Sequence, residues 1–467
     1  MRRPRLARRR AALGIGGALL ALAIGPLTST ALAVPAPVCN QAAAPDPWWG
    51  VTAPPLVFGT VIGTGTYATE LGMGAGAPDR PAKIERALDR LQGGSKPFIV
   101  KASSWFNDAG DRGAIGDFPA NPVQYTTATR RLEVVLWFNS KSRDRAGWVR
   151  YVRAKVRELA PHAATFVIGE EANVPLGPPW GLMPVEAIVD GVLAAKDELR
   201  RMGNNRTKVG FNAAESIAPD GGRSFFDEIR RVGNRDFRRA VDFVGLDAYP
   251  GAFGPYVPGF DYRAEMARAL RNARYCLIRA AGFPDSMPLH VTENGFGTGG
   301  DRSAEAQVEA LGQLIKAVHD YRGVYNIRAY EQWGLRDDRS DLGDPFVALG
   351  LLRDDYTPKP SFDLYRNLIR TLGARSTDPA VEITTAPPAV TTRRTARFAF
   401  RSIPANAAFE CRLDGGRWEP CGADRRYAGL AVGRHRFEVR AIGEGIRVVR
   451  PADAHAWRVE RESEPRR

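Results

Sequence analysis

Short apolar runs alternate with longer amphipathic segments over most of the chain. Two of these runs, Thr165–Ile168 and Val241–Leu246, are largely apolar at consecutive positions, which is typical of strands buried on both faces of a parallel sheet. Successive runs start 33 to 48 residues apart, which leaves room each time for a strand, a helix and two loops. Eight strands are predicted in this way, with starts near Val57, Phe98, Leu132, Thr165, Lys208, Val241, Leu289 and Ile327.

Helical periodicity occupies intervals between these runs. Apolar residues recur at helical spacing over 188–202, 266–277 and 308–318, the last of these after Ser303, which we expect to be an N-cap. Eight strands that alternate with helices predict an α/β fold, a (β/α)8 TIM barrel over residues 44–373. A doubly wound open sheet is the alternative.

The pattern changes after the barrel. Residues 374–394 are rich in Thr, Pro and Ala and predict an extended linker. Beyond it, apolar and polar residues alternate at period two, which predicts a small all-β sandwich over 395–462, followed by a tail at 463–467. This part resembles the immunoglobulin-like or fibronectin-type modules of secreted bacterial enzymes, notably in its run Phe409–Gly415 and its closing Trp457–Val459.

The N-terminus has the pattern of an export signal. Six arginines occur in the first ten residues, an apolar stretch follows, and Ala31-Leu32-Ala33 forms a small-x-small cleavage site. We therefore expect a signal peptide at 1–33, a short tail at 34–43, and a mature protein that is extracellular and carries no membrane span. The Sec and twin-arginine routes both remain open.

Composition and charge narrow the class of protein. A chain of 467 residues with 44% hydrophobic and 25% charged residues is ordinary for a globular protein and excludes a collagenous or multi-span membrane protein. Removing the six signal arginines lowers the formal net charge from +14 to about +8, and the remaining arginines are scattered, so a nucleic-acid partner is not expected. Contact with an anionic cell wall fits this charge, as does an ordinary solvated surface. The chain lacks the HExxH and paired CxxC motifs of zinc proteases and zinc ribbons, and it lacks the GxSxG motif of serine hydrolases. Neither a metal nor a cofactor is expected.

The chain contains four cysteines, which can form disulfides if the protein is exported. In an oxidising compartment Cys411 and Cys421 can form a disulfide within the all-β part, and closing so short a loop is worth about 3 kcal/mol. Cys39 and Cys276 remain, and they allow either a bridge from the N-terminal tail to a barrel helix or a buried free thiol at Cys276.

Acidic residues end two of the predicted barrel strands. The fourth strand is followed by Glu170 and Glu171, and the seventh ends at Glu293. Because catalytic groups of such barrels lie at the C-terminal ends of the strands, these carboxyls are expected to face each other across the barrel mouth. Cleavage of a glycosidic bond needs one protonated carboxyl and one carboxylate, about 5–5.5 Å apart when the mechanism is retaining. The residues leave either Glu170 or Glu171 as the acid/base.

The barrel also resembles the glycoside hydrolase clan A superfamily. The match lies in four segments: Ile168–Asn173, Gly245–Pro250, Leu289–Phe296 and Gly350–Pro360. The resemblance implies that Glu171 is the acid/base and Glu293 the nucleophile, that Tyr249 hydrogen-bonds the nucleophile, and that Trp333 is the floor on which a sugar stacks.

Two positions depart from the pattern of the clan. The Asn that usually precedes the acid/base, where it binds the sugar 2-hydroxyl, is Glu170 here, and a second carboxylate so close is expected to raise the pKa of its neighbour. The arginine often found at the end of the second strand is Lys101, which predicts a weaker contact with the nucleophile. Asn139 and Asn212, at the ends of the third and fifth strands, are candidate partners for sugar hydroxyls.

Together these features predict an exported, monomeric, cofactor-free and retaining glycoside hydrolase that acts on a β-linked oligo- or polysaccharide. The C-terminal module is expected to space the enzyme or to anchor it to a cell wall or polysaccharide. The alternative is a carbohydrate-binding protein that uses the same cleft with little or no turnover. The sequence leaves the sugar, and endo or exo action, open.

Overall fold

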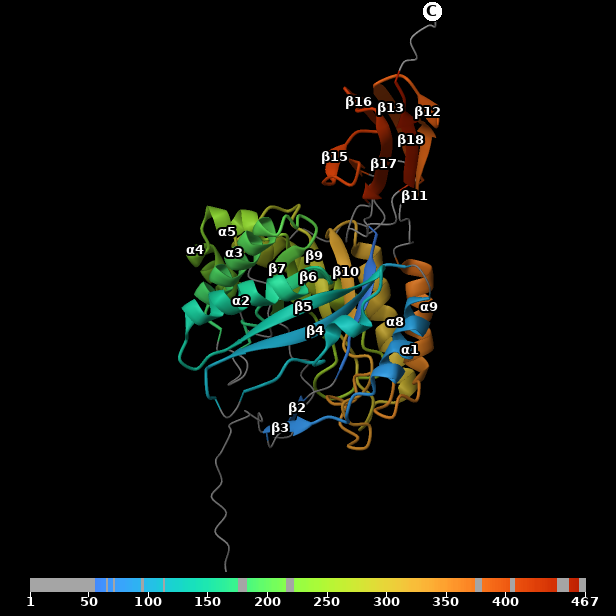
Figure 1. Cartoon of the computed structure of the whole chain (residues 1–467). Helices are drawn as coiled ribbons and strands as arrows, with labels where there is room; N and C mark the ends of the chain where they lie inside the picture. Colours follow the sequence, from blue (N-terminus) through green and yellow to red (C-terminus); the bar gives the residue numbers. More distant parts are fainter. Residues whose placement is uncertain are drawn as a thin grey trace, which may run out of the picture.

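The computed structural model of the chain describes residues 55–461 except 64–65, 70–71, 94–95, 112–113, 175–182, 216–221, 374–379, 404–407 and 443–452. The predicted signal peptide, the N-terminal tail, Cys39 and the tail at 463–467 lie outside the described residues. Figure 1 shows a barrel surrounded by helices and, at one end of it, a separate group of strands.

The first part is a closed barrel of eight parallel strands, as predicted. Its strands follow one another around the barrel in the order β1-β10-β9-β8-β7-β6-β5-β4. Each begins within two residues of its predicted start, so the α/β barrel is confirmed and the open sheet is excluded. The strands are β1 (Val57–Val61), β4 (Phe98–Asn107), β5 (Arg130–Asn139), β6 (Ala163–Ile168), β7 (Lys208–Ala214), β8 (Phe243–Asp247), β9 (Leu289–Asn294) and β10 (Ile327–Gln332).

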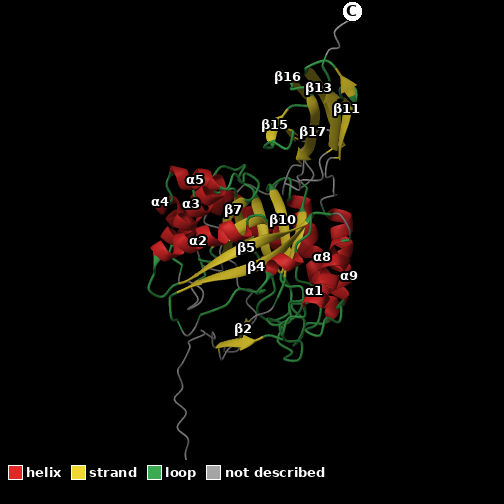
Figure 2. Ribbon diagram, in the orientation of Figure 1, coloured by secondary structure: helices red, strands yellow, loops and turns green. Residues whose placement is uncertain are grey.

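Helices cover most of the outside of the barrel (Figure 2). Ser303 caps α8 as predicted, because its side chain accepts a hydrogen bond from the backbone N–H of Ala306. The helical segments are α1 (Pro81–Gln92), a 3₁₀ turn at Pro122–Tyr125, α2 (Arg145–Leu159), α3 (Val185–Arg201), α4 (Arg223–Val232), α5 (Arg235–Ala240), α6 (Tyr262–Asn272), a π-helical turn at Ala273–Leu277, α7 (Ile278–Ala280), α8 (Ala304–Tyr321) and α9 (Pro360–Leu372). None of the helices in the described part of the chain is both long and apolar enough to cross a bilayer.

The regular alternation of strand and helix is broken between β4 and β5. In the described residues of this connection only the short turn at Pro122–Tyr125 is helical, and the two strands are ten residues long. Figure 2 shows both strands at the front of the barrel without a long helix over them. A hairpin of β2 (Thr66–Thr69) and β3 (Gly72–Ala75) follows β1.

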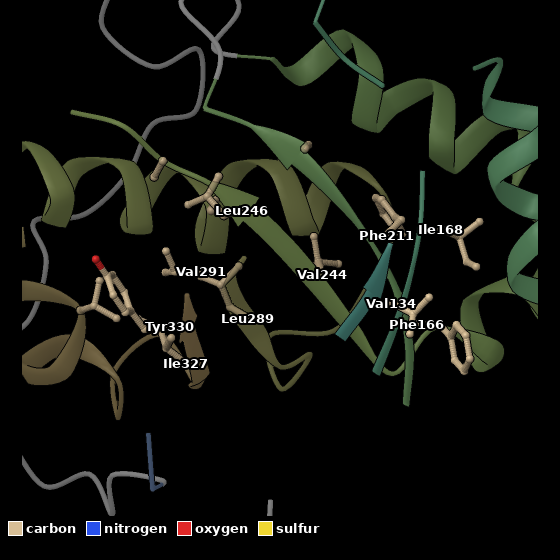
Figure 3. Packing of buried hydrophobic residues seen from close by; sticks show 14 of the residues in the cluster. Val134, Phe166, Ile168, Phe211, Val244, Leu246, Leu289, Val291, Ile327 and Tyr330 are labelled. Atoms are coloured by element: carbon tan, nitrogen blue, oxygen red, sulfur yellow. The ribbon is translucent and has the colours of Figure 1, made fainter. Parts of the chain in front are cut away.

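The main hydrophobic core lies between the barrel strands and the helices. Alternate strand residues such as Val134, Phe166 and Leu246 belong to it (Figure 3). Their neighbours in sequence, including Glu133, Thr165 and Asp247, are buried without belonging to this core. Because successive residues of a strand point to opposite faces, the polar neighbours face the barrel interior. The interior is therefore charged, although the strands had been expected to be apolar on both faces.

The C-terminal part consists of two antiparallel sheets, with one additional parallel pairing. One sheet has the order β11-β13-β16 and the other the order β12-β18-β17-β14-β15. Phe398 of β13 stacks on Phe437 of β17 at 4.0 Å between ring centroids, so the core lies between the sheets. The strands are β11 (Ala380–Thr385), β12 (Val390–Thr391), β13 (Thr395–Ile403), β14 (Ala408–Leu413), β15 (Glu419–Cys421), β16 (Asp424–Ala428), β17 (Gly433–Ile442) and β18 (Asp453–Val459).

The prediction of an extended linker over 374–394 is wrong for residues 380–385 and 390–391. Residues 380–385 form β11, which pairs with β13, and residues 390–391 form β12, which pairs with β18. A solvated extended segment and an edge strand have similar backbone angles, so the two differ only in whether a partner strand is present. The pairing is a tertiary feature that composition does not reveal.

The all-β part lies at the end of the barrel where the strands begin. Arg206, which precedes β7, forms an ion pair of 3.2 Å with Glu410 of β14. In Figure 1 the all-β part and the β2–β3 hairpin lie at opposite ends of the barrel. The C-terminal ends of the barrel strands are therefore not covered by this module.

The predicted disulfide between Cys411 and Cys421 is present and joins β14 to β15. Cys276 is also disulfide-bonded, which removes the alternative of a free thiol, and its predicted partner Cys39 lies outside the described residues.

Loss of the Cys411–Cys421 bridge is expected to destabilise the all-β part. Because the bridge closes a loop of ten residues, Cys411→Ser with Cys421→Ser should lower its free energy of unfolding by about 3 kcal/mol. Hydrogen exchange of the full chain, followed on peptides from β13 and β17, measures this loss, and peptides from α8 serve as the internal reference. Unchanged protection in β13 and β17 would contradict the prediction.

Candidate active site

Glu293 is held by two donors at the C-terminal end of β9. Its side chain is buried, with 6% of the residue exposed. Lys101 Nζ lies 2.6 Å from Oε1, and the Tyr249 hydroxyl donates to Oε2 at 2.8 Å. Each carboxylate oxygen thus meets a different donor, which fixes the orientation of the group and favours its ionised form.

Lys101 provides the positive charge of this site. It lies within β4, six residues before the end of the strand, and not at the strand end where it was placed from the sequence. Burial alone would lower the pKa of Lys101, but the charges of Glu170 and Glu293 raise this pKa well above its usual range. The contact with Glu293 is a single short one, from the ammonium to Oε1, and whether it is weaker than that of an arginine stays a prediction.

Glu170 lies directly beside Glu293. Its Oε1 accepts hydrogen bonds from Asn212 Nδ2 at 2.7 Å and from Lys101 Nζ at 3.5 Å. Asn212 Nδ2 also donates to Asp247 Oδ2 at 2.6 Å, and Asn212 Oδ1 accepts from the backbone N–H of Glu171 at 3.0 Å. The predicted polar residue Asn212 therefore binds three acidic residues of the site at once.

Glu171 reaches the site through an unusual turn after β6. Gly169 has φ +85°, and a Cβ at that position would lie 2.5 Å from Met183 Sδ. Glu171 itself has φ +44°, in the left-handed region that non-glycine residues seldom occupy and that is often found at functional sites. Burial, followed by the charge of Glu293, raises the pKa of Glu171 to about 8. A carboxyl with this pKa is protonated at neutral pH.

The acidic residues of the site form one electrostatic unit. Carboxyl oxygens of Glu170, Asp247 and Glu293 lie within 4.8 Å of one another. Burial raises the pKa of Glu170 and of Glu293 to about 8, against the opposing effect of Lys101, and it raises that of Asp247 well above its usual range. Such a cluster titrates as a whole and retains protons at neutral pH. The three carboxyls are near enough to share a divalent cation, but the Lys101 ammonium already lies among them.

Trp333 follows β10 and borders the same space. It is half-buried, and Lys101 Nζ lies 5.9 Å from the centre of its ring. A pocket next to Trp333 is lined by Val61, Gly63 and Asp338, among others. Lys359, which donates to Asp337 Oδ1 at 2.6 Å and to Ala348 O at 2.9 Å, anchors the loop that carries the pocket.

The structure brings most of the predicted residues together. Tyr249, Lys101, Asn212 and Glu170 contact the cluster around Glu293 directly or through one residue. Asn139 does not join them by a hydrogen bond. Although it ends β5 as predicted, its amide donates to Asn107 Oδ1 at 2.8 Å, at the end of β4.

Three acidic residues of the interior were not identified from the sequence. Asp247 ends the apolar run of β8, so the rule that selected Glu293 could have found it. Glu133 and Glu331 lie within their strands, are fully buried and hydrogen-bond to each other through their carboxyl groups. Gly59 makes room for Glu331, because a Cβ there would lie 2.8 Å from Glu331 Cγ. No pattern in the sequence separates these two residues from surface glutamates.

The buried Glu331 is expected to make stability depend on pH. Burial, and then the charge of Glu133, raises the pKa of Glu331 well above its usual range in the folded state. Above the unfolded pKa of about 4.3 the unfolded chain has lost this proton while the folded chain keeps it, so stability falls as pH rises, by about 1.4 kcal/mol per pH unit. Glu331→Gln removes the titrating group, so the free energy of unfolding should depend less on pH in this range.

Urea unfolding of the wild type and the variant between pH 4.5 and 8 measures the difference in slope. Glu158→Gln, which changes a largely exposed side chain, is the matched control and should follow the wild type. Parallel curves for wild type and Glu331→Gln would show that Glu331 is ionised in the folded protein.

Comparison with known proteins gave matches in structure only. No family model matches the chain, and no curated protein matches it. The similar solved structures include a family 39 glycoside hydrolase from Bacteroides cellulosilyticus, at 12% identity and a TM-score of 0.47, over 87% of this chain and 79% of that one. They also include an endo-β-1,4-mannanase from Thermotoga petrophila, at 12% identity and a TM-score of 0.42, over 88% of this chain and 99% of that one.

A calcium-binding mutant of β-glucuronidase 2 from Bacteroides uniformis is also similar, at 12% identity and a TM-score of 0.42. The match covers 88% of this chain but 46% of the glucuronidase, so the chain spans about half the length of that protein. These likenesses concern the overall architecture, and the functional assignment depends on the site's own residues. The chain is a closed (β/α)8 barrel followed by an all-β domain, similar in architecture to solved glycoside hydrolases.

Proposed function

We propose that the chain is a retaining glycoside hydrolase that cleaves β-linked sugars, with Glu293 as nucleophile and Glu171 as general acid and base. The observation that carries this proposal is the pair of donors that holds one of two neighbouring buried carboxyls. Glu293 has a donor on each oxygen, Lys101 and Tyr249, while Glu171 has a pKa of about 8. A carboxylate beside a protonated carboxyl is the pair that glycosidic cleavage requires.

The choice between the two roles follows from their partners. Burial raises the pKa of both groups to about 8, so they compete for protons in the same pH range. An ammonium at 2.6 Å and a hydroxyl at 2.8 Å stabilise the ionised form of Glu293. The Glu171 carboxyl has no such pair of donors among its described contacts, so it retains the proton.

The reaction takes two steps. In the first, Glu171 donates its proton to the glycosidic oxygen, the bond from that oxygen to the anomeric carbon breaks, and a Glu293 oxygen forms an ester with that carbon. In the second, the Glu171 carboxylate removes a proton from water, the water oxygen attacks the anomeric carbon, and the ester breaks. Both carboxyls return to their initial states. Trp333 offers the flat apolar surface against which a sugar ring stacks.

The protein is proposed to act outside the cell. The Cys411–Cys421 bridge supports an oxidising compartment, and residues 1–33 supply a matching export signal in the sequence. The immunoglobulin-like module is proposed to space the monomeric enzyme from a cell wall or polysaccharide. Its contact at Arg206, where β7 begins, leaves the opposite end of the barrel open to substrate.

Covalent trapping tests this proposal. The full chain is incubated with a panel of aryl β-glycosides and with fluorinated glycosyl inactivators of the 2-deoxy-2-fluoro and 5-fluoro series, and its intact mass is measured. We expect a mass increase of one fluorosugar per chain, located on the peptide that contains Glu293. Sugar binding without turnover or adduct in any series would instead indicate a binding protein.

A further inference from the structure

Exposed apolar side chains are concentrated on two loops at the mouth of the barrel. Seven large apolar side chains of the described residues are exposed, and four of them lie on the loop 248–261 after β8 or on the loop 333–359 after β10. These four are Phe253, Val257, Leu342 and Phe346. Single exposed apolar residues are normal on a protein surface, whereas residues that lie together mark a surface that binds a ligand or a partner.

Two of these side chains form an aromatic pair that adjoins the candidate active site. The ring centroids of Phe253 and Phe346 are 5.7 Å apart, and the centroid of Phe253 is 5.2 Å from that of Tyr249. The Tyr249 hydroxyl in turn donates to Glu293 Oε2 at 2.8 Å. A continuous series of contacts therefore leads from the proposed nucleophile to two rings that are 55% and 43% exposed.

A buried arginine holds the loop that carries Phe253. Arg302, which precedes α8, is 4% exposed, and its guanidinium donates to Ala252 O and, at 2.7 Å, to Gly254 O. These two carbonyl groups belong to the residues on either side of Phe253. The ring is thus fixed from below although most of its surface is in contact with solvent.

The loop that carries Phe346 is held from the same side. Gly297, in the connection between β9 and α8, lies so close to Pro345 O that a side chain at this glycine would clash with it. The Asp344 side chain also accepts a hydrogen bond from the backbone N–H of Phe346 at 2.9 Å. An exposed aromatic pair on two anchored loops is preorganised, so little conformational entropy is lost when a ligand binds to it.

The place of the pair around the barrel indicates which part of a substrate it meets. The strands follow in the order β9-β8-β7-β6, so β8 lies on the arc between Glu293 of β9 and Glu171, which follows β6. The group that departs in the first step must lie next to the acid that protonates it. The loop after β8, with Phe253, therefore borders the space that the leaving group occupies.

The chemistry of the pair favours an apolar leaving group. A Trp or Tyr ring combines an apolar face with a polar group, whereas Phe253 and Phe346 offer apolar surface alone. Val257 and Leu342, the other exposed large apolar side chains of these loops, are apolar as well. A sugar ring carries hydroxyl groups that need hydrogen-bond partners when they leave water, but an aryl or alkyl group does not.

We propose that Phe253 and Phe346 bind an apolar leaving group, so that the preferred substrates are β-glycosides of aryl or alkyl alcohols. This inference rests on the proposed glycosidase function and specifies the substrate class of the same site. Contact with the pair removes apolar surface of both the substrate and the two rings from water, which favours binding in proportion to the area that is buried.

Two alkyl glycosides of one sugar test the inference on the full-length wild type. Hexyl and methyl β-glycosides have leaving alcohols of similar acidity and differ in apolar surface, and their sugar is the one that the aryl panel identifies. We expect kcat/KM for the hexyl glycoside to exceed that for the methyl glycoside by at least about 10-fold, the effect of burying about two of its five additional methylene groups. The gain should appear mainly in KM, because the contact is the same in the ground state and the transition state. Equal values of kcat/KM would overturn the inference.

Variants of the pair locate the effect. Phe253→Ala with Phe346→Ala should lower kcat/KM at least about 10-fold for the hexyl glycoside and less than about 3-fold for the methyl glycoside. Met202→Ala, which changes a side chain that is 38% exposed at the end of α3, is the matched control and should leave both values near those of the wild type. Equal losses on the two glycosides would show that the pair merely supports Tyr249, and would overturn its role in binding.

A β-linked disaccharide of the same sugar covers the alternative ligand. The double variant should change kcat/KM for this disaccharide no more than for the methyl glycoside. A loss on the disaccharide as large as the loss on the hexyl glycoside would assign the pair to a second sugar ring and would overturn the choice of an apolar leaving group.

The two proposals fail in different ways. Turnover of aryl β-glycosides, with an adduct on Glu293 but no preference for the hexyl over the methyl glycoside, removes only the inference about the aromatic pair. Absence of turnover and of an adduct with every glycoside removes the proposed hydrolase together with it. The comparison of the two alkyl glycosides on the wild type does not depend on whether the variants fold.

Discussion

Glu293→Gln is expected to reduce kcat for aryl β-glycosides by at least about 10⁴-fold, because no covalent intermediate can form without the carboxylate. The amide keeps the size of the side chain, and its oxygen can still accept from Tyr249 or Lys101. The loss should therefore appear in kcat while the protein stays folded. Steady-state kinetics of the purified variant measure it, with the absence of the fluorosugar adduct as a second readout.

A buried carboxylate elsewhere provides the control for this variant. Glu198 on α3 is 6% exposed and forms ion pairs with Arg153 and Arg157 on the outside of the barrel. Glu198→Gln should cost stability but leave kcat within a few-fold of the wild type. An active Glu293→Gln enzyme, or equal losses in the two variants, would remove Glu293 from the role of nucleophile.

Glu171→Gln is expected to reduce kcat/KM by about 10²–10⁴-fold for glycosides with poor leaving groups, since these need a proton on the departing oxygen. With 2,4-dinitrophenyl glycosides, whose leaving group departs without a proton, the first step should be nearly preserved and the ester should accumulate. Azide, which attacks the ester without a general base, should restore turnover and yield a β-glycosyl azide.

The pH profile distinguishes Glu171 from its neighbour Glu170. Because the pKa of Glu171 is about 8, the acid is protonated below that pH, and kcat/KM of the wild type should fall as pH rises above it. Glu171→Gln should lose this basic limb, whereas Glu170→Gln should keep it. The reverse pattern, with azide rescue in Glu170→Gln, would assign the acid/base role to Glu170.

The positions of the barrel strands could be predicted because each strand is marked by a local run of apolar residues. In a parallel barrel, short apolar runs that form strands alternate with amphipathic segments that form helices. The spacing of these runs predicts the first residue of each strand to within two residues. The same regularity concealed the exception between β4 and β5, where a long helix was expected and the described residues contain only the 3₁₀ turn at Pro122–Tyr125. The edge strands β11 and β12 were missed for a related reason, since an extended segment becomes a strand only when a partner is beside it.

In the candidate site, too, the sequence reveals some features and not others. Glu170, Glu171 and Glu293 are visible in the sequence as acidic residues that end apolar runs, and Tyr249 and Trp333 came from resemblance to a superfamily. By contrast, Asn139 occupies an equivalent strand end and hydrogen-bonds to Asn107 instead. The position of a residue along its strand predicts the end of the barrel at which its side chain lies. It does not predict the group with which that side chain forms a hydrogen bond.

The sequence by itself determined the order of the elements, the closed α/β architecture, the bridge between Cys411 and Cys421 and the end of the barrel that holds the acidic residues, because these depend on periodicity and spacing along the chain. Only the tertiary structure decided that Lys101 and Tyr249 each hold one oxygen of Glu293, that Glu133 and Glu331 share the interior, and that Asn212 joins Glu170 to Asp247. The physical reason is that ionisation and hydrogen bonding depend on buried groups from different strands that meet inside the barrel. Their separation is set by the closure of the barrel and not by distance along the chain.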